Sequence, residues 1–137
     1  MKKGSLGFLV LFGSITLASV SAEVRAQGDG FYKGKTVRIM VGSTAGGFYD
    51  RWARLFAKYM PKYIPGQPEI VAQNMTGAGS VIAVNHVFNV AKPDGLTMVM
   101  PLNGIYVDQL VGRKEMQFDL RKLHWIGSPA VESIIFY

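Results

Sequence analysis

Apolar residues follow two different periodicities in the middle of the chain, which predicts a strand followed by a helix. Thr36–Val41 is a short β-branched apolar run, typical of a buried strand, and the glycine-rich segment Gly42–Gly47 ends it. From Asp50 the apolar residues recur every three to four positions, as on one face of a helix. The apolar positions expected to face the protein are Trp52, Leu55, Phe56 and Tyr59. The positions expected to face solvent are Arg51, Arg54, Lys58 and Lys62.

The same pattern then repeats along the chain. Glu69–Asn74 is expected to form a second strand, Met75–Ser80 a second glycine-bearing loop, and residues 81–91 a second helix. A turn at residues 93–95 (Pro-Asp-Gly) leads into a third strand, Leu96–Met100. The remaining expected elements are a short helix at 105–111 and strand segments at Trp125–Ile126 and Ser133–Tyr137.

The predicted order of elements is strand, helix, strand, helix, strand, which indicates an α/β fold with a parallel sheet. In such sheets ligands bind beyond the carboxyl ends of the strands. Both glycine-rich loops follow predicted strands, so we expect a binding site at that edge.

The two loops offer neutral hydrogen-bond donors to an anion. Glycines let the backbone approach a ligand closely, and a helix N-terminus presents unpaired N–H groups. Asp50 is expected either to cap the helix or to receive a ligand hydroxyl, and capping is favoured because aspartate is a preferred N-cap residue. Two ordinary strand-to-helix turns would show the same spacing. The candidate ligand-binding residues are Ser43, Thr44, Ala45, Gly46, Gly47, Tyr49, Asp50, Asn74, Gly77, Ala78, Gly79 and Ser80.

Motifs for phosphate binding and catalysis are absent. Gly42 and Gly47 have P-loop spacing, but phenylalanine and tyrosine follow where an NTPase needs lysine and serine or threonine. Neither histidine, His86 nor His124, has a second histidine at metal-ligand spacing. Ser43, His86 and Asp50 have the residue types of a catalytic triad, but nothing in the sequence brings them together. The nucleophile-elbow motif G-x-S-x-G is also missing. We therefore expect no catalytic residue, no metal and no cofactor.

The first 26 residues have the pattern of a signal peptide. Two lysines precede an apolar run, residues 6–20, and cleavage is expected after Ala22 or Ala26. The alternative is a membrane anchor, but the run is shorter than the about 20 residues that span a bilayer. The sequence contains no cysteine, which excludes thiol chemistry. The net charge of +6 comes from dispersed basic residues, which favours steering of anions over nucleic-acid binding.

Several motifs, taken in order, resemble the tripartite tricarboxylate transporter receptors, also called Bug receptors. The resemblance covers about residues 32–137 and rests on these segments: Tyr32–Ile39, Ala45–Asp50 with Ala53-Arg54, Ile64–Pro68, Val71–Ser80, Ala91–Thr97, and Phe118-Asp119 with Trp125–Gly127. The sequence departs from the family at Thr76, where proline is usual, and at Phe48, where glycine is common. Both departures bear on which ligand is bound.

The resemblance implies a type II periplasmic-binding-protein clamshell with the ligand in a cleft between two lobes. Residues 27–128 would form the N-terminal lobe and residues 129–137 the start of the crossover to a second lobe. The apolar run at the chain end also fits a terminal strand docked in the sheet. The implied protein is a periplasmic, monomeric receptor that passes a small carboxylate to membrane permease subunits. An exported hydrolase and a metabolite-sensing module are the alternatives.

Overall fold

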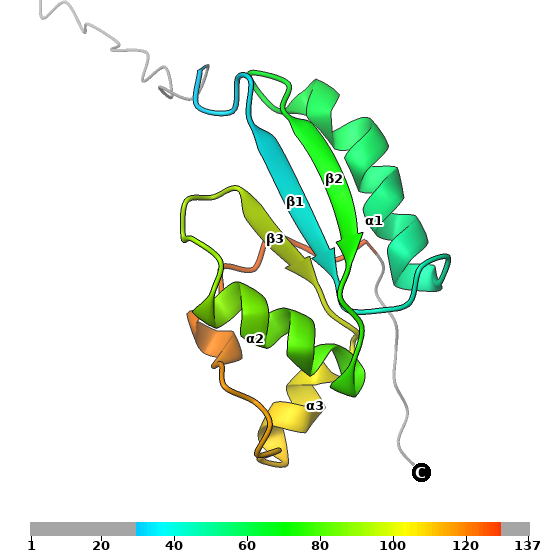
Figure 1. Ribbon diagram of the computed structural model, residues 1–137, viewed down its shortest axis with the longest axis vertical. Helices are drawn as coiled ribbons and strands as arrows, with labels where there is room; N and C mark the ends of the chain where they lie inside the picture. The colour runs from blue at the N-terminus through cyan, green and yellow to red at the C-terminus, as the bar shows by residue number, and fades with distance from the viewer. Residues whose placement is uncertain (1–29, 130–137) are drawn as a thin grey trace, which may run out of the picture.

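β1 (Thr36–Val41) is the central strand of a parallel sheet in the computed structural model, which describes residues 30–129 (Figure 1). β2 (Glu69–Asn74) and β3 (Thr97–Met100) lie on either side of it, in the order β2-β1-β3. In this register Val41 is opposite both Asn74 and Met100. The three strands therefore end level with one another, and the loops that follow them start from one edge.

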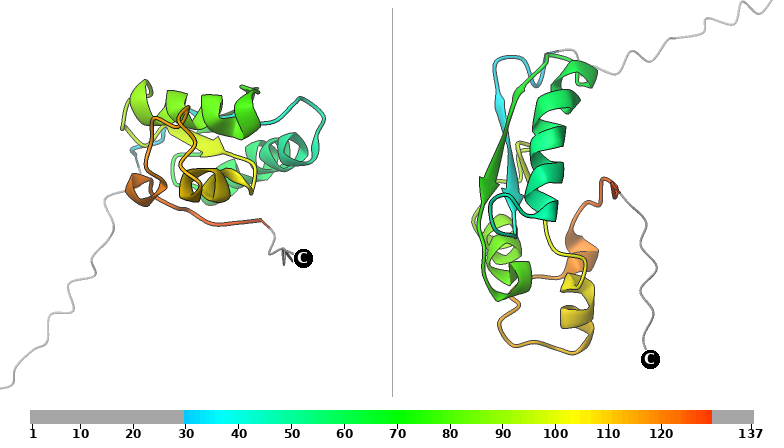
Figure 2. Two further views of the ribbon diagram at one scale, coloured as in Figure 1. Left: turned by 90° about the horizontal axis from the view of Figure 1, so that it is seen from below. Right: turned by 90° about the vertical axis from the view of Figure 1, so that its right-hand side faces the viewer.

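Helices cover both faces of the sheet, as the alternation of side chains along the strands requires. Val37, Ile39 and Val41 of β1 pack with Ala53 of α1 (Phe48–Tyr59). On β3, Met98 and Met100 join this cluster, whereas Val99 faces α2 (Val81–Asn89). The view from below in Figure 2 shows α1 and α2 on opposite sides of the sheet.

The predicted α/β fold with a parallel sheet is confirmed, and the bounds of the first two strands agree with the prediction. β3 begins one residue later than predicted, and α2 ends at Asn89. α1 begins at Phe48, before the predicted start at Asp50. Residues 30–129 also include short 3₁₀ helices at Met60–Tyr63, Ala78–Ser80 and Leu120–Lys122.

The prediction of which side of α1 faces the sheet was wrong in part. The buried residues of α1 are Asp50 and Ala53, while Leu55 and Tyr59 are 44% and 45% exposed. The reason is that hydrogen bonds draw the Asp50 side chain inward and fix the rotation of the helix about its axis. The basic residues are exposed, as predicted.

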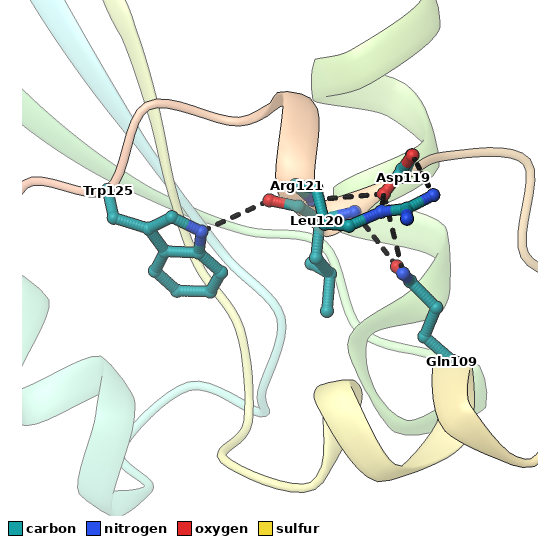
Figure 3. A network of polar contacts seen from close by, with 5 residues as sticks. All are labelled: Gln109, Asp119, Leu120, Arg121 and Trp125. Carbon is teal, nitrogen blue, oxygen red and sulfur yellow. Dashed lines mark hydrogen bonds and ion pairs between the residues drawn. The ribbon is translucent and has the colours of Figure 1, made fainter.

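A second core lies between α2, α3 (Ile105–Leu110) and the segment that follows α3. It consists of Val81, Val84, Ile105, Phe118 and Leu120. Figure 3 shows the polar contacts that fix this segment: the Gln109 side chain accepts from the Leu120 N–H at 2.8 Å and donates to Asp119 at 3.4 Å.

The prediction of a strand at Trp125–Ile126 was wrong. Both residues are exposed and have no strand partner among the described residues. The indole N–H of Trp125 donates to the Leu120 carbonyl at 3.1 Å, which holds the segment against the preceding turn instead (Figure 3). The predicted signal peptide and the predicted strand Ser133–Tyr137 lie outside the described residues. Within residues 30–129, no helix has the length and apolar character needed to cross a membrane.

Candidate ligand-binding site

Three loops meet at the carboxyl edge of the sheet: residues 42–47, 75–80 and 101–104. The first loop leads through α1 to β2, on one side of β1, while β3 lies on the other side. The strand order therefore reverses between β1 and β3. Open α/β sheets bind ligands in the crevice at such a switch point.

Asp50 is a carboxylate, only 1% exposed, that holds the first loop to α1. It accepts hydrogen bonds from the Gly46 N–H at 2.7 Å, from Nε of Arg54 at 2.9 Å and from Nδ2 of Asn74 at 2.9 Å. The bond from Arg54 and then the bond from Gly46 are the main reasons that the pKa of Asp50 is lowered from 3.8 to about 2. The carboxylate is therefore ionised at neutral pH, and its burial is offset by these donors.

The prediction that Asp50 is the N-cap of the first helix was wrong. Gly47 occupies the N-cap position, and Asp50 is the third residue of the helix. Its side chain reaches back to the amide of Gly46, which has a φ of +79°. An ionised carboxylate in the first turn also interacts favourably with the helix dipole.

Asn74 connects the end of β2 to the first loop. Its Nδ2 donates to the Ser43 carbonyl at 3.0 Å as well as to Asp50, and its Oδ1 accepts from Nη2 of Arg54 at 3.2 Å. Both amide donors and the amide oxygen thus have partners inside the protein. In the described structure Asn74 and Asp50 support the first loop through these bonds. The prediction that they contact a ligand stays a prediction.

Ser80 joins the ends of β1 and β3. Its side chain is completely buried, and its Oγ donates to the Gly42 carbonyl at 3.1 Å and accepts from the Leu102 N–H at 2.9 Å. The contact is so close that a Cβ on Gly42 would overlap the Ser80 hydroxyl. Residue 42 must therefore be glycine for Ser80 to occupy this position.

The second loop is strained. Four consecutive residues have positive φ: Gly77 at 138°, Ala78 at 47°, Gly79 at 67° and Ser80 at 80°. A left-handed conformation costs a non-glycine residue about 1–2 kcal/mol. Ala78 and Ser80 both bear this cost, and strain of this kind concentrates at functional sites.

Ser43 carries a buried hydroxyl that lacks a partner. Within residues 30–129, its Oγ is the buried side-chain oxygen for which the structure gives no hydrogen bond. Leaving a buried hydroxyl unpaired costs about 1–3 kcal/mol, so a hydrogen-bonding ligand at this position would be favoured. The oxygen lies near the N-cap: a Cβ on Gly47 would be 3.9 Å from it. The first N–H groups of α1, which have no intrahelical acceptor, lie at the same end.

Most other predicted site residues lie at the surface of the two loops. Thr44, Ala45, Gly46, Ala78 and Gly79 are exposed, and Gly47, Tyr49 and Gly77 are half-buried. The two predicted loops are brought together at one edge of the sheet.

The sequence did not indicate that the third loop, residues 101–104, belongs to the site. The Asn103 N–H donates to the Tyr49 hydroxyl at 3.1 Å, so residues 101–104 border the same site. The strand order would have indicated these residues, because the loop after β3 lies at the switch point between β1 and β3.

The three loops contain no lysine or arginine, so the site offers neutral donors. The ion pair of Arg113 with Asp108 lies beside the second loop, and Oδ2 of Asp108 would be 3.5 Å from a Cβ on Gly79. Asp50 is hydrogen bonded to Gly46, Arg54 and Asn74 rather than to His86. The described part of the chain contains no group of three or more acidic, histidine or cysteine side chains that could hold a metal ion.

No family model matches the chain. A search of curated proteins also returns no match.

Proposed function

We propose that this protein is an extracytoplasmic solute-binding receptor that captures a small carboxylate for a tripartite tricarboxylate-type transporter. The observation that carries the proposal is the unpaired, buried hydroxyl of Ser43, which lies beside the N-terminus of α1 at the carboxyl edge of the sheet. A carboxylate would pair with that hydroxyl and with the free N–H groups of the helix.

The hydrogen bonds that hold the loops in place support ligand binding rather than catalysis. Asp50 and Asn74 are used to fix loop geometry, so the site presents donors without a general base in hydrogen-bond contact with Ser43. Preorganised neutral donors bind an anion while costing little reorganisation. The strained second loop would close the other side of the ligand.

The finer fold assignment belongs to this proposal as well. The described α/β domain would be the N-terminal lobe of a type II clamshell, and a second lobe would cover the ligand. The resemblance of the loop sequences to the tripartite receptors supports this arrangement, and it implies a periplasmic location and permease partners. A monomeric receptor would suffice for that role.

Calorimetric titration of the purified protein with a panel of small mono-, di- and tricarboxylates tests the proposal. We expect one class to bind, and Ser43→Ala to weaken binding by about 1.5–3 kcal/mol, the range for a hydrogen bond to a charged group. Thr36→Ala is the matched control, because Thr36 carries a hydroxyl at the start of β1, away from the loop that contains Ser43, where it bonds to Glu69. No binding by any carboxylate, or equal effects of the two substitutions, would contradict the proposal.

A further inference from the structure

An apolar stripe runs along the outer side of α1 and into the 3₁₀ helix after it. Phe48, Leu55 and Tyr59 are each between 44% and 49% exposed, and Tyr63 is 75% exposed. The ring of Trp52 lies 6.3 Å from that of Phe48, measured between centroids. The members of the α1 stripe are Phe48, Trp52, Leu55, Tyr59 and Tyr63. Together they form a continuous exposed apolar surface, which usually marks an interaction site.

The α1 stripe carries two shallow, open hollows. One hollow, of about 350 Å³, is lined by Phe48, Arg51, Trp52 and Leu55. The other, of about 530 Å³, is lined by Leu55, Phe56, Tyr59, Met60, Lys62 and Tyr63. Leu55 belongs to both and separates them. Two adjacent hollows along one helix would each receive a large apolar side chain of a partner.

The border of the α1 stripe is positively charged. Nζ of Lys62 lies 4.7 Å from the ring centroid of Tyr63, and Nζ of Lys58 lies 5.4 Å from that of Tyr59. Arg51 is exposed at the first hollow. The one acidic residue between positions 48 and 63 is Asp50, which is buried and paired with Arg54. No exposed acidic side chain of this segment therefore competes with a partner's carboxylates for these cations.

We propose that the α1 stripe binds a protein segment with two apolar anchor side chains and an acidic border, such as an amphipathic helix. Charge complementarity specifies the partner, because acidic residues beside the anchors would face Arg51, Lys58 and Lys62. A second copy of this chain fits poorly, since the same basic border would meet itself across a two-fold axis. The two hollows favour discrete side chains over a smooth lipid surface. This inference does not depend on the proposed ligand.

The experiment measures binding of a designed amphipathic helix that carries leucine and phenylalanine anchors bordered by glutamates. Fluorescence anisotropy with the labelled peptide and the unmodified protein is expected to show saturable binding. The same peptide with lysine in place of each glutamate is expected to bind at least about tenfold more weakly. Equal binding of both peptides, or no saturable binding of the acidic one, overturns the proposal.

Variants of the protein locate the contact. Leu55→Ser and Lys62→Glu should each weaken binding of the acidic peptide by about tenfold or more. The matched controls are Leu110→Ser, at a leucine that is 83% exposed on α3, and Lys114→Glu, at an exposed lysine outside the α1 stripe. These controls should bind as the unmodified protein does. Equal loss in the controls overturns the proposal.

Two further measurements distinguish other occupants. If phosphatidylglycerol vesicles bind with the same sensitivity to Leu55→Ser while the acidic peptide does not bind, the α1 stripe is a lipid-binding surface and the proposal is overturned. If sedimentation shows a dimer that Tyr63→Ser dissociates, the occupant is a second copy, and the proposal is overturned in that case too.

Discussion

Asp50 and Asn74 are joined by a hydrogen bond of 2.9 Å between the carboxylate of one and the amide of the other. The bond connects the first turn of α1 to the last residue of β2, 24 positions further along the chain. It also sets which side of α1 faces the sheet. Together with the bond from the Gly46 N–H to the same carboxylate, it joins the first loop, α1 and β2.

Replacing Asp50 with alanine should destabilise the protein by about 2–4 kcal/mol, because it leaves donors on Gly46, Arg54 and Asn74 without their acceptor. The free energy of unfolding from urea denaturation measures the effect. Arg54→Ala is the comparison variant: the Arg54 side chain is 55% exposed, so its loss should cost less. A larger loss for Arg54→Ala would contradict this assignment.

Gly42 and Ser80 should be strongly coupled in a double-mutant cycle. Gly42→Ala places a methyl group onto the Ser80 hydroxyl and should cost about 1–3 kcal/mol by overpacking. Ser80→Gly removes the obstacle and relieves a left-handed residue, but it loses two hydrogen bonds.

The double variant should therefore be close in stability to Ser80→Gly alone. The coupling energy in denaturation experiments is expected to be about 1 kcal/mol or more. Additive single effects would mean that the two residues do not meet as described.

Stability should fall in acid between about pH 4 and pH 2. The folded-state pKa values of Asp50 and Asp119 are lowered from 3.8 to about 2, in each case chiefly by a hydrogen bond from a neighbouring arginine. A depressed folded pKa stabilises the protein above the unfolded pKa, and this contribution is lost as the pH falls through the folded pKa.

Unfolding free energies measured across this range should show a shallower decline in Asp50→Asn and in Asp119→Asn than in the unmodified protein. The double variant should be shallower still. A decline that is unchanged in both single variants would assign the acid sensitivity to other groups.

Gln109→Met should destabilise the segment after α3 by about 1–3 kcal/mol. Methionine has a similar length but leaves the Leu120 N–H without the acceptor that it has at 2.8 Å. Hydrogen exchange of the Leu120 amide should accelerate together with the loss of stability. Gln117→Met, at an exposed position nearby, is the control and should change neither quantity appreciably.

The strands were predictable from the sequence because β-branched runs bounded by glycine and proline specify them locally. The orientation of α1 was not, because its apolar residues lie on more than one side of the helix: Phe56 packs on the core while Leu55 is exposed. A tertiary bond to Asp50 favours the side that is buried. For the site, local pattern identified the two loops but not the part played by Ser80. Its left-handed backbone and its bond to Leu102 depend on β3 being in place.

The bridging position of Ser80 has a consequence for biogenesis. Its hydroxyl bonds to a carbonyl 38 residues earlier and to an amide 22 residues later, so the second loop cannot reach its final shape before Leu102 is in place beside it. Ligand capture would then be a late property, acquired only when β3 has joined the sheet. A chain held by a chaperone before that moment would contain every residue of the two glycine loops but would lack the loop conformation that the proposed site requires.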